Sequence, residues 1–240
     1  MLNLEILNSK YNLKVYNIAH VGAHNGKEVL VYNRLFPNAD VHLFEPNKSS
    51  YEELENKFKD KNKIYLYNLA LGNESGEKLL NTSSSFPNTS SILEPNLHKE
   101  YYPEVVFDNE EIIQLKKFDS LGLKNVNFMS IDTQGYELEV LKGSKEQLSN
   151  MDYLIVEINR IHLYDKSPLV KDIDKFLKSY SFIRIVTTYW GKECVWGDGF
   201  YIKRDKISHK QFIRAVIKNF LYKNIYIYKL VRFFKTQRKI

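Results

Sequence analysis

The chain has 240 residues, of which 43% are hydrophobic and 14% aromatic, with ten glycines, six prolines and one cysteine. This composition fits one large domain with a substantial core and excludes a disordered or fibrous chain. The formal charge of +6 is uneven, because residues 203–240 carry 12 Lys and Arg against one acid, Asp205, and residues 1–202 carry a net −5. The basic excess is confined to the tail, which weakens a nucleic-acid-binding interpretation of the whole chain.

No segment indicates export or membrane insertion. Cys194 is the single cysteine and cannot form an internal disulfide. The first ten residues lack the basic-then-apolar order of a signal peptide, and no apolar run approaches the roughly 18 residues of a spanning helix. We therefore expect a cytoplasmic protein, with a peripheral position on the inner face of a membrane left open by the tail.

Short apolar runs alternate with amphipathic segments of helical length. This alternation predicts an α/β fold, a seven-stranded, mostly parallel Rossmann-like sheet with helices on both faces. The last two strands are expected to close the sheet as an antiparallel pair. Strands are expected at residues 15–22, 39–45, 62–71, 126–132, 151–158, 182–189 and 197–204, and helices at 51–58, 135–150 and 170–180.

Residues 73–125 interrupt the alternation. A Ser-rich stretch and the polar-apolar segment EVVFDNEEIIQLKKFD predict an inserted hairpin and loop after the third strand. Such an insertion could form a substrate lid, and a long surface loop is the alternative.

Informative residues follow the first two strands, at the edge where open parallel sheets bind ligands. Gly22 and Gly26 lie in a G-x-x-x-G turn, which differs from the G-x-G-x-x-G of dinucleotide-binding proteins. Glu45 ends the second strand about twenty residues later, and a carboxylate there can accept both hydroxyls of a ribose. His24, beside the turn, is expected to be structural.

The fourth strand ends at Asp132, the residue most expected to be functional. Gly135 then allows a sharp turn into the next helix. Helical spacing predicts that Leu138 packs inward and that Glu137 is exposed.

Five segments, in order along the chain, resemble the FkbM family of S-adenosylmethionine-dependent methyltransferases. They are GAHNG, FEPNKSSYEEL, NLALGN, LKKFDSL and IDTQGYELEVLKG, and the resemblance extends from about Val15 to Lys203. It implies a class I methyltransferase domain, which we place over residues 1–204. Residues 205–240, outside the resemblance, are expected to form a basic amphipathic helical tail. The activity it implies is O-methylation of a sugar hydroxyl in a surface glycan or in its lipid- or nucleotide-linked precursor.

The resemblance also implies roles for the residues of the first turn. Gly22, Ala23 and Gly26 would wrap the methionine part of S-adenosylmethionine. Many class I enzymes carry an acid at the position of His20, so the hold on the cofactor amine is expected to differ here.

Further along the chain, the resemblance implies that Glu45 binds the ribose, and Ala70 with Leu71 the adenine. Asp132 would lie near the cofactor's amino group and the acceptor hydroxyl.

Methyl transfer to a hydroxyl needs a proton acceptor or a metal ion, because the hydroxyl pKa is far above neutrality. The catalytic candidates are Asp132, Glu157 and His162. Asp132, Glu157 and Asn159 could instead hold a divalent cation, a possibility that the sequence leaves open.

The tail has a basic and an apolar side on a helical wheel, with Lys223 alone in the apolar sector. A helix of this kind suits an anionic membrane surface, and packing of its first half on the sheet is the alternative. The expected partners are a carbohydrate or glycolipid acceptor and this membrane surface, with no nucleic acid.

Two other functions remain open. A non-catalytic, membrane-docking scaffold would keep the fold, and it is favoured by His20, which stands where many class I enzymes have an acid. An NAD(P)-dependent oxidoreductase fits the sheet and Glu45 but not the glycine spacing.

Overall fold

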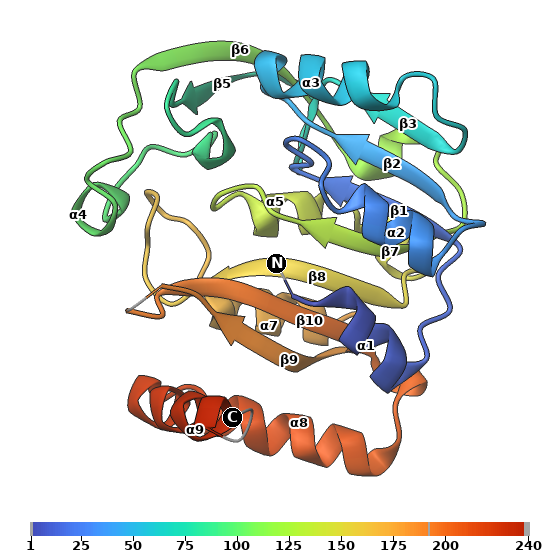
Figure 1. Cartoon of the computed structure of the whole chain (residues 1–240), viewed down its shortest axis with the longest axis vertical. Coiled ribbons are helices and arrows are strands. Elements are labelled where there is room, and N and C mark those ends of the chain that lie inside the picture. Colours follow the sequence, from blue (N-terminus) through green and yellow to red (C-terminus); the bar gives the residue numbers. More distant parts are fainter. Residues whose placement is uncertain (1, 192, 238–240) are drawn as a thin grey trace.

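A seven-stranded sheet forms the centre of the protein (Figure 1). The computed structural model describes residues 2–191 and 193–237. The strand order is β3-β2-β1-β7-β8-β10-β9, in which β10 runs antiparallel to β8 and β9 and the other neighbouring pairs are parallel. The predicted mostly parallel sheet and its closing antiparallel pair are therefore confirmed. The strands are β1 (Asn17–Val21), β2 (Asp40–Phe44), β3 (Ile64–Tyr67), β7 (Val126–Ile131), β8 (Tyr153–Asn159), β9 (Phe182–Tyr189) and β10 (Trp196–Lys203).

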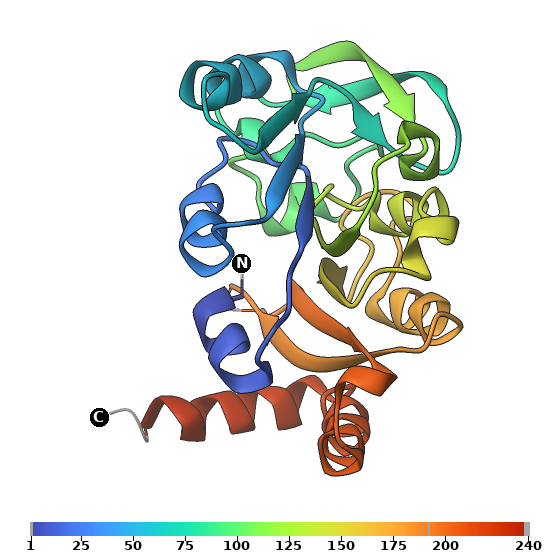
Figure 2. The same ribbon diagram turned by 90° about the vertical axis from the view of Figure 1, so that its right-hand side faces the viewer.

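Helices cover both faces of this sheet, as Figure 2 shows along its edge. One face carries α1 (Leu4–Tyr11), α2 (Val29–Leu35) and α3 (Lys48–Phe58); the other carries α5 (Glu137–Lys142), α6 (Lys145–Leu148) and α7 (Val170–Lys178). Successive side chains of a strand point to opposite faces. Accordingly, Phe128 and Ile155 belong to the core under α1–α3, while Met129 and Leu154 belong to the core under α5–α7.

The insertion after β3 forms a second, small sheet in the order β4-β6-β5. Its strands are β4 (Ala70–Leu71), β5 (Gly76–Thr82) and β6 (Asn109–Lys116), and β5 pairs antiparallel with β6 as the predicted hairpin requires. Residues 83–108 join these two strands, and we call them the cap segment. They contain a 3-10 turn (Pro87–Thr89) and α4 (His98–Tyr101), and a second 3-10 turn (Phe118–Leu121) follows β6.

Two predicted elements are divided in the structure. The strand expected at 62–71 separates into β3 and β4, which belong to different sheets. The helix expected at 135–150 breaks at Gly143 into α5 and α6. A Cβ on Gly143 would lie 1.8 Å from the carbonyl oxygen of Gly72, so the chain passes too close to the loop after β4 for any side chain.

The tail forms two helices, α8 (His209–Leu221) and α9 (Ile225–Gln237), instead of one continuous helix. Both lie beyond β9, at the end of the molecule opposite α3 (Figures 1 and 2). Lys223, the cation that lay in the apolar sector of the continuous wheel, falls in the turn between them. Within the described part of the chain, no helix is long and apolar enough to cross a bilayer.

Candidate active site

A cavity of about 380 Å³ opens at the carboxyl ends of β1, β2 and β7, under the cap segment. This volume is in the range of small-molecule sites. Most residues expected to bind cofactor or to act in catalysis line it, namely His20, Gly22, Ala23, Glu45, Ala70, Leu71, Asp132 and Glu157. Gly26, Asn159 and His162 are not among its lining residues.

The turn after β1 is held tightly between the neighbouring strands. The backbone amides of Gly22 and Ala23 donate to the carbonyl oxygen of Phe44, at 2.9 and 3.0 Å. Gly22 has a φ of +78°, and a Cβ on it would lie 1.8 Å from the carbonyl oxygen of Asp132. The glycine is thus required by the close approach of β1 and β7 at the floor of the cavity.

Gly26 has a different role from the one implied by the resemblance. A Cβ there would lie 2.6 Å from the Phe58 ring and 2.7 Å from Leu54. Gly26 therefore permits the turn to pack on α3, and the structure does not bring it to the cavity.

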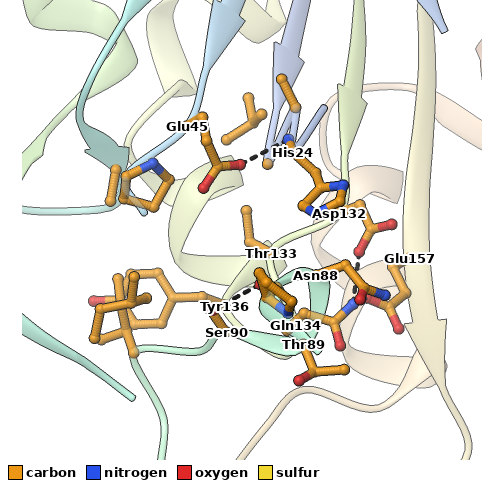
Figure 3. A pocket seen from close by; sticks show the side chains of 18 of the residues that line it. His24, Glu45, Asn88, Thr89, Ser90, Asp132, Thr133, Gln134, Tyr136 and Glu157 are labelled. Carbon is orange, nitrogen blue, oxygen red and sulfur yellow. Dashed lines mark hydrogen bonds between the residues drawn. The ribbon is translucent and has the colours of Figure 1, made fainter. Parts of the chain in front are cut away.

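Glu45 lies on one side of the cavity, opposite Asp132 and Glu157 (Figure 3). One carboxylate oxygen accepts from the amide of His24 at 2.7 Å, and the other from the amide of Asn47 at 2.9 Å. Burial raises the pKa of this carboxyl to about 7, even though the two amides favour its charged form. Each oxygen keeps a second lone pair, so a pair of vicinal hydroxyls could still donate to it.

Asp132 and Glu157 are bridged by one side-chain amide. Nε2 of Gln134 donates to Asp132 Oδ1 at 2.8 Å and to Glu157 Oε2 at 2.9 Å. The Tyr164 hydroxyl lies 3.0 Å from Gln134 Oε1 and 3.0 Å from the carbonyl oxygen of Thr89 in the cap segment. Tyr164 therefore orients the amide and also joins it to the cap. Burial, and next the Asp132 charge, raise the pKa of Glu157.

Glu137 is fully buried, which corrects the expectation that it is exposed. Its Oε1 accepts from the amides of Thr133 (3.1 Å) and Gly135 (2.9 Å). Gln134 and Gly135 both have positive φ. The turn that they form directs the Glu137 side chain back toward the loop at residues 133–135, which Glu137 stabilises through these hydrogen bonds. Burial raises the pKa of Glu137 to about 7.

His20 is buried, with its Nδ1 3.2 Å from the Tyr32 hydroxyl. Burial lowers the pKa of the imidazole, so at neutral pH His20 contributes an uncharged polar ring where many class I enzymes have an acid. Any charge that faces a cofactor amine therefore comes from other residues of the cavity.

His162 and Asn159 do not join the two carboxylates. The His162 side chain is exposed, and its Nδ1 lies 2.7 Å from the carbonyl oxygen of Ser167. Asn159 is buried at the end of β8, outside the cavity lining. Among the residues that the structure describes, no group of three or more His, Cys, Asp or Glu side chains is arranged to hold a metal ion.

The opposite wall of the cavity comes from the insertion, which the sequence offered as a lid or a surface loop, and from β10, which no sequence pattern connected with the site. The cap segment contributes Phe86, His98 and Tyr102, and β10 contributes Trp196 and Asp198. Trp196 Nε1 donates to the Tyr102 hydroxyl at 2.5 Å, which joins β10 to the cap. The cap residues and the β10 residues are more than 90 positions apart in the sequence, so no local pattern could have grouped them. Gln134, in contrast, lies inside the motif IDTQGYE and could have been singled out there.

S-adenosylmethionine, the cofactor implied by the resemblance, fits the residues present. Its ribose hydroxyls have an acceptor with spare lone pairs in Glu45, and its cationic sulfonium would meet a cavity that contains Asp132, Glu157 and Asp198. Leu69, Ala70 and Leu71 provide an apolar wall for a flat base.

Comparison with known proteins agrees with this architecture. The family model described as the methyltransferase FkbM domain matches residues 20–184, more than half of the chain. The 2-O-methyltransferase NoeI of Sinorhizobium fredii is 22% identical over 176 residues, which cover 69% of this chain and 72% of that protein.

A solved methyltransferase structure shares the fold. The crystal structure of a methyltransferase FkbM from Methylobacillus flagellatus has a TM-score of 0.55 and 16% identity, over 80% of this chain but only 45% of that longer one. A magnesium protoporphyrin IX methyltransferase from Synechocystis, solved with bound S-adenosylmethionine, has a TM-score of 0.49 and 12% identity, over 83% of this chain and 76% of that chain.

Proposed function

The chain belongs to the FkbM methyltransferase family, and we propose that this S-adenosylmethionine-dependent methyltransferase acts on a sugar hydroxyl. The acceptor would be a surface glycan or its lipid- or nucleotide-linked precursor. One observation carries the choice of an oxygen acceptor: Asp132 and Glu157 are held by a common amide at the floor of the cavity. A hydroxyl must lose a proton during transfer, and a carboxylate beside it can accept that proton. The relative named a 2-O-methyltransferase supports the same choice.

When bound, the cofactor supplies an electrophilic methyl group on a sulfonium. Glu45 would accept the ribose hydroxyls, and the turn at Gly22 and Ala23, which lines the cavity, would hold the amino-acid part. Holding acceptor and donor in register can lower the barrier by up to about 7–11 kcal/mol.

Asp132 is the residue we assign as general base. The raised pKa of Glu157 means that Glu157 retains a proton more readily than an ordinary carboxyl. During transfer Asp132 would accept the proton of the acceptor hydroxyl, whose oxygen would take the methyl group from the sulfonium, and Asp132 would then release that proton to solvent. Gln134 is a positioning residue, since its amide fixes Asp132 relative to Glu157.

The wall formed by the cap segment and β10 is the proposed acceptor site. It combines aromatic rings, Tyr102 and Trp196, with the polar groups of His98, Glu104 and Asp198. Aromatic faces pack against the C–H face of a sugar ring, and carboxylates and imidazoles bind its hydroxyls. This mixture favours a carbohydrate over a wholly apolar acceptor.

Two binding and activity measurements test the proposal. Calorimetry should give binding of S-adenosylmethionine and none of NAD, and binding of neither would favour the non-catalytic scaffold. Incubation with labelled cofactor and a panel of nucleotide sugars and glycolipids, followed by mass spectrometry, should give a product heavier by one methyl group on oxygen. Methylation on nitrogen or carbon would refute the acceptor assignment.

Asp132→Ala should abolish transfer while leaving the circular dichroism spectrum and the melting temperature nearly unchanged. Asp60→Ala removes an exposed carboxylate at the end of α3 and provides the matched control. Near-normal turnover by Asp132→Ala would remove Asp132 from the mechanism.

A further inference from the structure

The two tail helices present an unusually apolar outer surface. Nine of the eighteen large hydrophobic side chains that are exposed among the described residues lie on α8 and α9. These helices span only residues 209–237, a small part of the chain. Single exposed apolar residues are common on proteins, but a contiguous set marks an interaction surface.

On α8 the exposed apolar residues form one stripe. They are Ile213, Val216, Ile217, Phe220 and Leu221, with the i, i+3, i+4, i+7, i+8 spacing of a single helical face. Phe220 is 72% exposed. The opposite face of α8 packs on the sheet through buried Ala215 and through Asn219, whose Nδ2 donates to the carbonyl oxygen of Arg184 at 2.7 Å.

The second helix repeats the pattern. Tyr226, Leu230, Phe233 and Phe234 are exposed at positions i, i+4, i+7 and i+8 of α9. The opposite face packs inward through Tyr228, whose hydroxyl accepts from the amide of Tyr189 at 2.8 Å. We call the two stripes together the tail face.

The tail face is fixed to the body and is not a loose extension. Arg160, directly after β8, donates from Nη2 to the carbonyl oxygen of Tyr222 at 2.6 Å, at the end of α8. Its guanidinium lies 4.1 Å from the centroid of the Tyr189 ring, which also packs edge-on against Tyr228. The outward direction of both stripes is therefore set by contacts with the sheet.

Cations lie beside the α8 stripe, and acids are absent from the sequence of both tail helices. From Lys206 to Gln237 the chain has no Asp or Glu. Lys210, Arg214 and Lys223 are exposed beside the α8 stripe. Arg232 on α9 is turned toward the body, where its Nη1 donates to the carbonyl oxygen of Tyr189 at 3.4 Å and to Cys194 Sγ at 3.2 Å. An apolar stripe with flanking cations is complementary to a bilayer that carries anionic head groups over an acyl interior.

We infer that the tail face docks the enzyme on an anionic lipid bilayer, with the two apolar stripes in the interfacial layer and the cations at the head groups. A second copy of this chain would bring two strongly basic faces together, which is unfavourable. A nucleic acid would satisfy the cations and leave Phe220 and its neighbours in water. Docking would also place the cavity near the membrane, whichever acceptor is used. The reason is that α9 packs on Tyr189, and Tyr189 pairs with Gly197 of β10. The two neighbours of Gly197, Trp196 and Asp198, line the cavity.

The test is co-sedimentation of the full chain with vesicles of phosphatidylcholine alone or mixed equally with phosphatidylglycerol. Binding is expected to the anionic vesicles only and to weaken as salt is raised. Phe220→Ser and Leu230→Ser should each reduce partitioning by about tenfold or more. Leu30→Ser and Ile112→Ser are matched controls, since both side chains are 74% exposed on other elements, and they should leave binding unchanged.

A charge-reversal pair separates the local effect from net charge. Lys210→Glu with Arg214→Glu should reduce binding by about fivefold per residue, while Lys59→Glu with Lys61→Glu, exposed near the opposite end, should reduce it far less. Equal loss in the two pairs, or no effect of Phe220→Ser, would overturn the proposal. A dimer in light scattering that Phe220→Ser dissociates would also overturn it, since the tail face would then bind a second copy of the chain. Binding to nucleic acid in place of vesicles would overturn it too.

Discussion

Gly22→Ala is the substitution that most directly tests the geometry of the cavity floor. The added methyl group would lie 1.8 Å from the carbonyl oxygen of Asp132 and 2.9 Å from its carbonyl carbon. An ordinary contact needs more than 3 Å, so β1 and β7 would have to separate by over an ångström at their carboxyl ends. Alanine at a φ of +78° adds strain of its own.

The expected magnitude combines these two effects. Left-handed backbone costs a non-glycine residue about 1–2 kcal/mol, and overpacking a rigid site costs up to about 3 kcal/mol. The sum, about 4 kcal/mol, corresponds to a fall in melting temperature of about 8–16 °C for a chain of this size. Because Asp132 is displaced, affinity for S-adenosylmethionine should fall as well.

Gly122→Ala is the matched control. Gly122 has a φ of +66°, and no atom lies within 4 Å of the position of its Cβ, so only the backbone strain applies. The melting temperature of this variant should fall by about 2–8 °C. Thermal unfolding followed by circular dichroism compares the two variants, and equal falls would refute the argument that contact with Asp132 is what requires a glycine at position 22.

Three further predictions concern buried polar groups. Glu45 must be ionised to accept two ribose hydroxyls, so calorimetric affinity for S-adenosylmethionine should weaken about tenfold per pH unit below the Glu45 pKa of about 7. Glu45→Gln should bind the cofactor weakly at every pH, and an unchanged pH profile in that variant would contradict the role. The folded-state pKa of Glu137, about 7, lies above its ordinary value of 4.5, so its contribution to stability is lost as the pH rises through 7. The urea midpoint should therefore fall between about pH 5 and about pH 8, and this fall should become shallower in Glu137→Gln. Tyr164→Phe removes the hydroxyl that contacts Gln134 and Thr89, and it should lower kcat more than it lowers cofactor affinity. A loss confined to cofactor binding would contradict the positioning role of Tyr164.

Local sequence patterns predicted the main sheet because a buried strand appears in the sequence as a short run of consecutive apolar residues. Each predicted strand overlaps a strand of the structure, with residues 62–71 divided between β3 and β4. Asn47 caps α3, accepting from the amide of Ser50 at 3.0 Å. Glu45 and Asp132 were identified because they directly follow such runs.

Predictions failed where a distant segment decided the outcome. Helical spacing predicted an exposed Glu137, but the preceding turn carries the side chain back onto two backbone amides. Gly143 ends α5 because the loop at Gly72 passes beside it. His162 follows a functional strand in the sequence, yet the chain turns it toward Ser167 and away from the cavity.

The sequence alone determined the order of the elements, the family, the glycine turn with its acidic partners, and the concentration of positive charge in the tail. These properties depend only on the residues of individual segments and on the order of those segments along the chain. The tertiary structure alone decided which carboxylates share an amide, that the cap segment and β10 form the second wall of the cavity, and that the tail turns an apolar stripe outward on each of two helices. Such features depend on contacts between residues far apart in the chain, and those contacts arise only when the sheet brings them together.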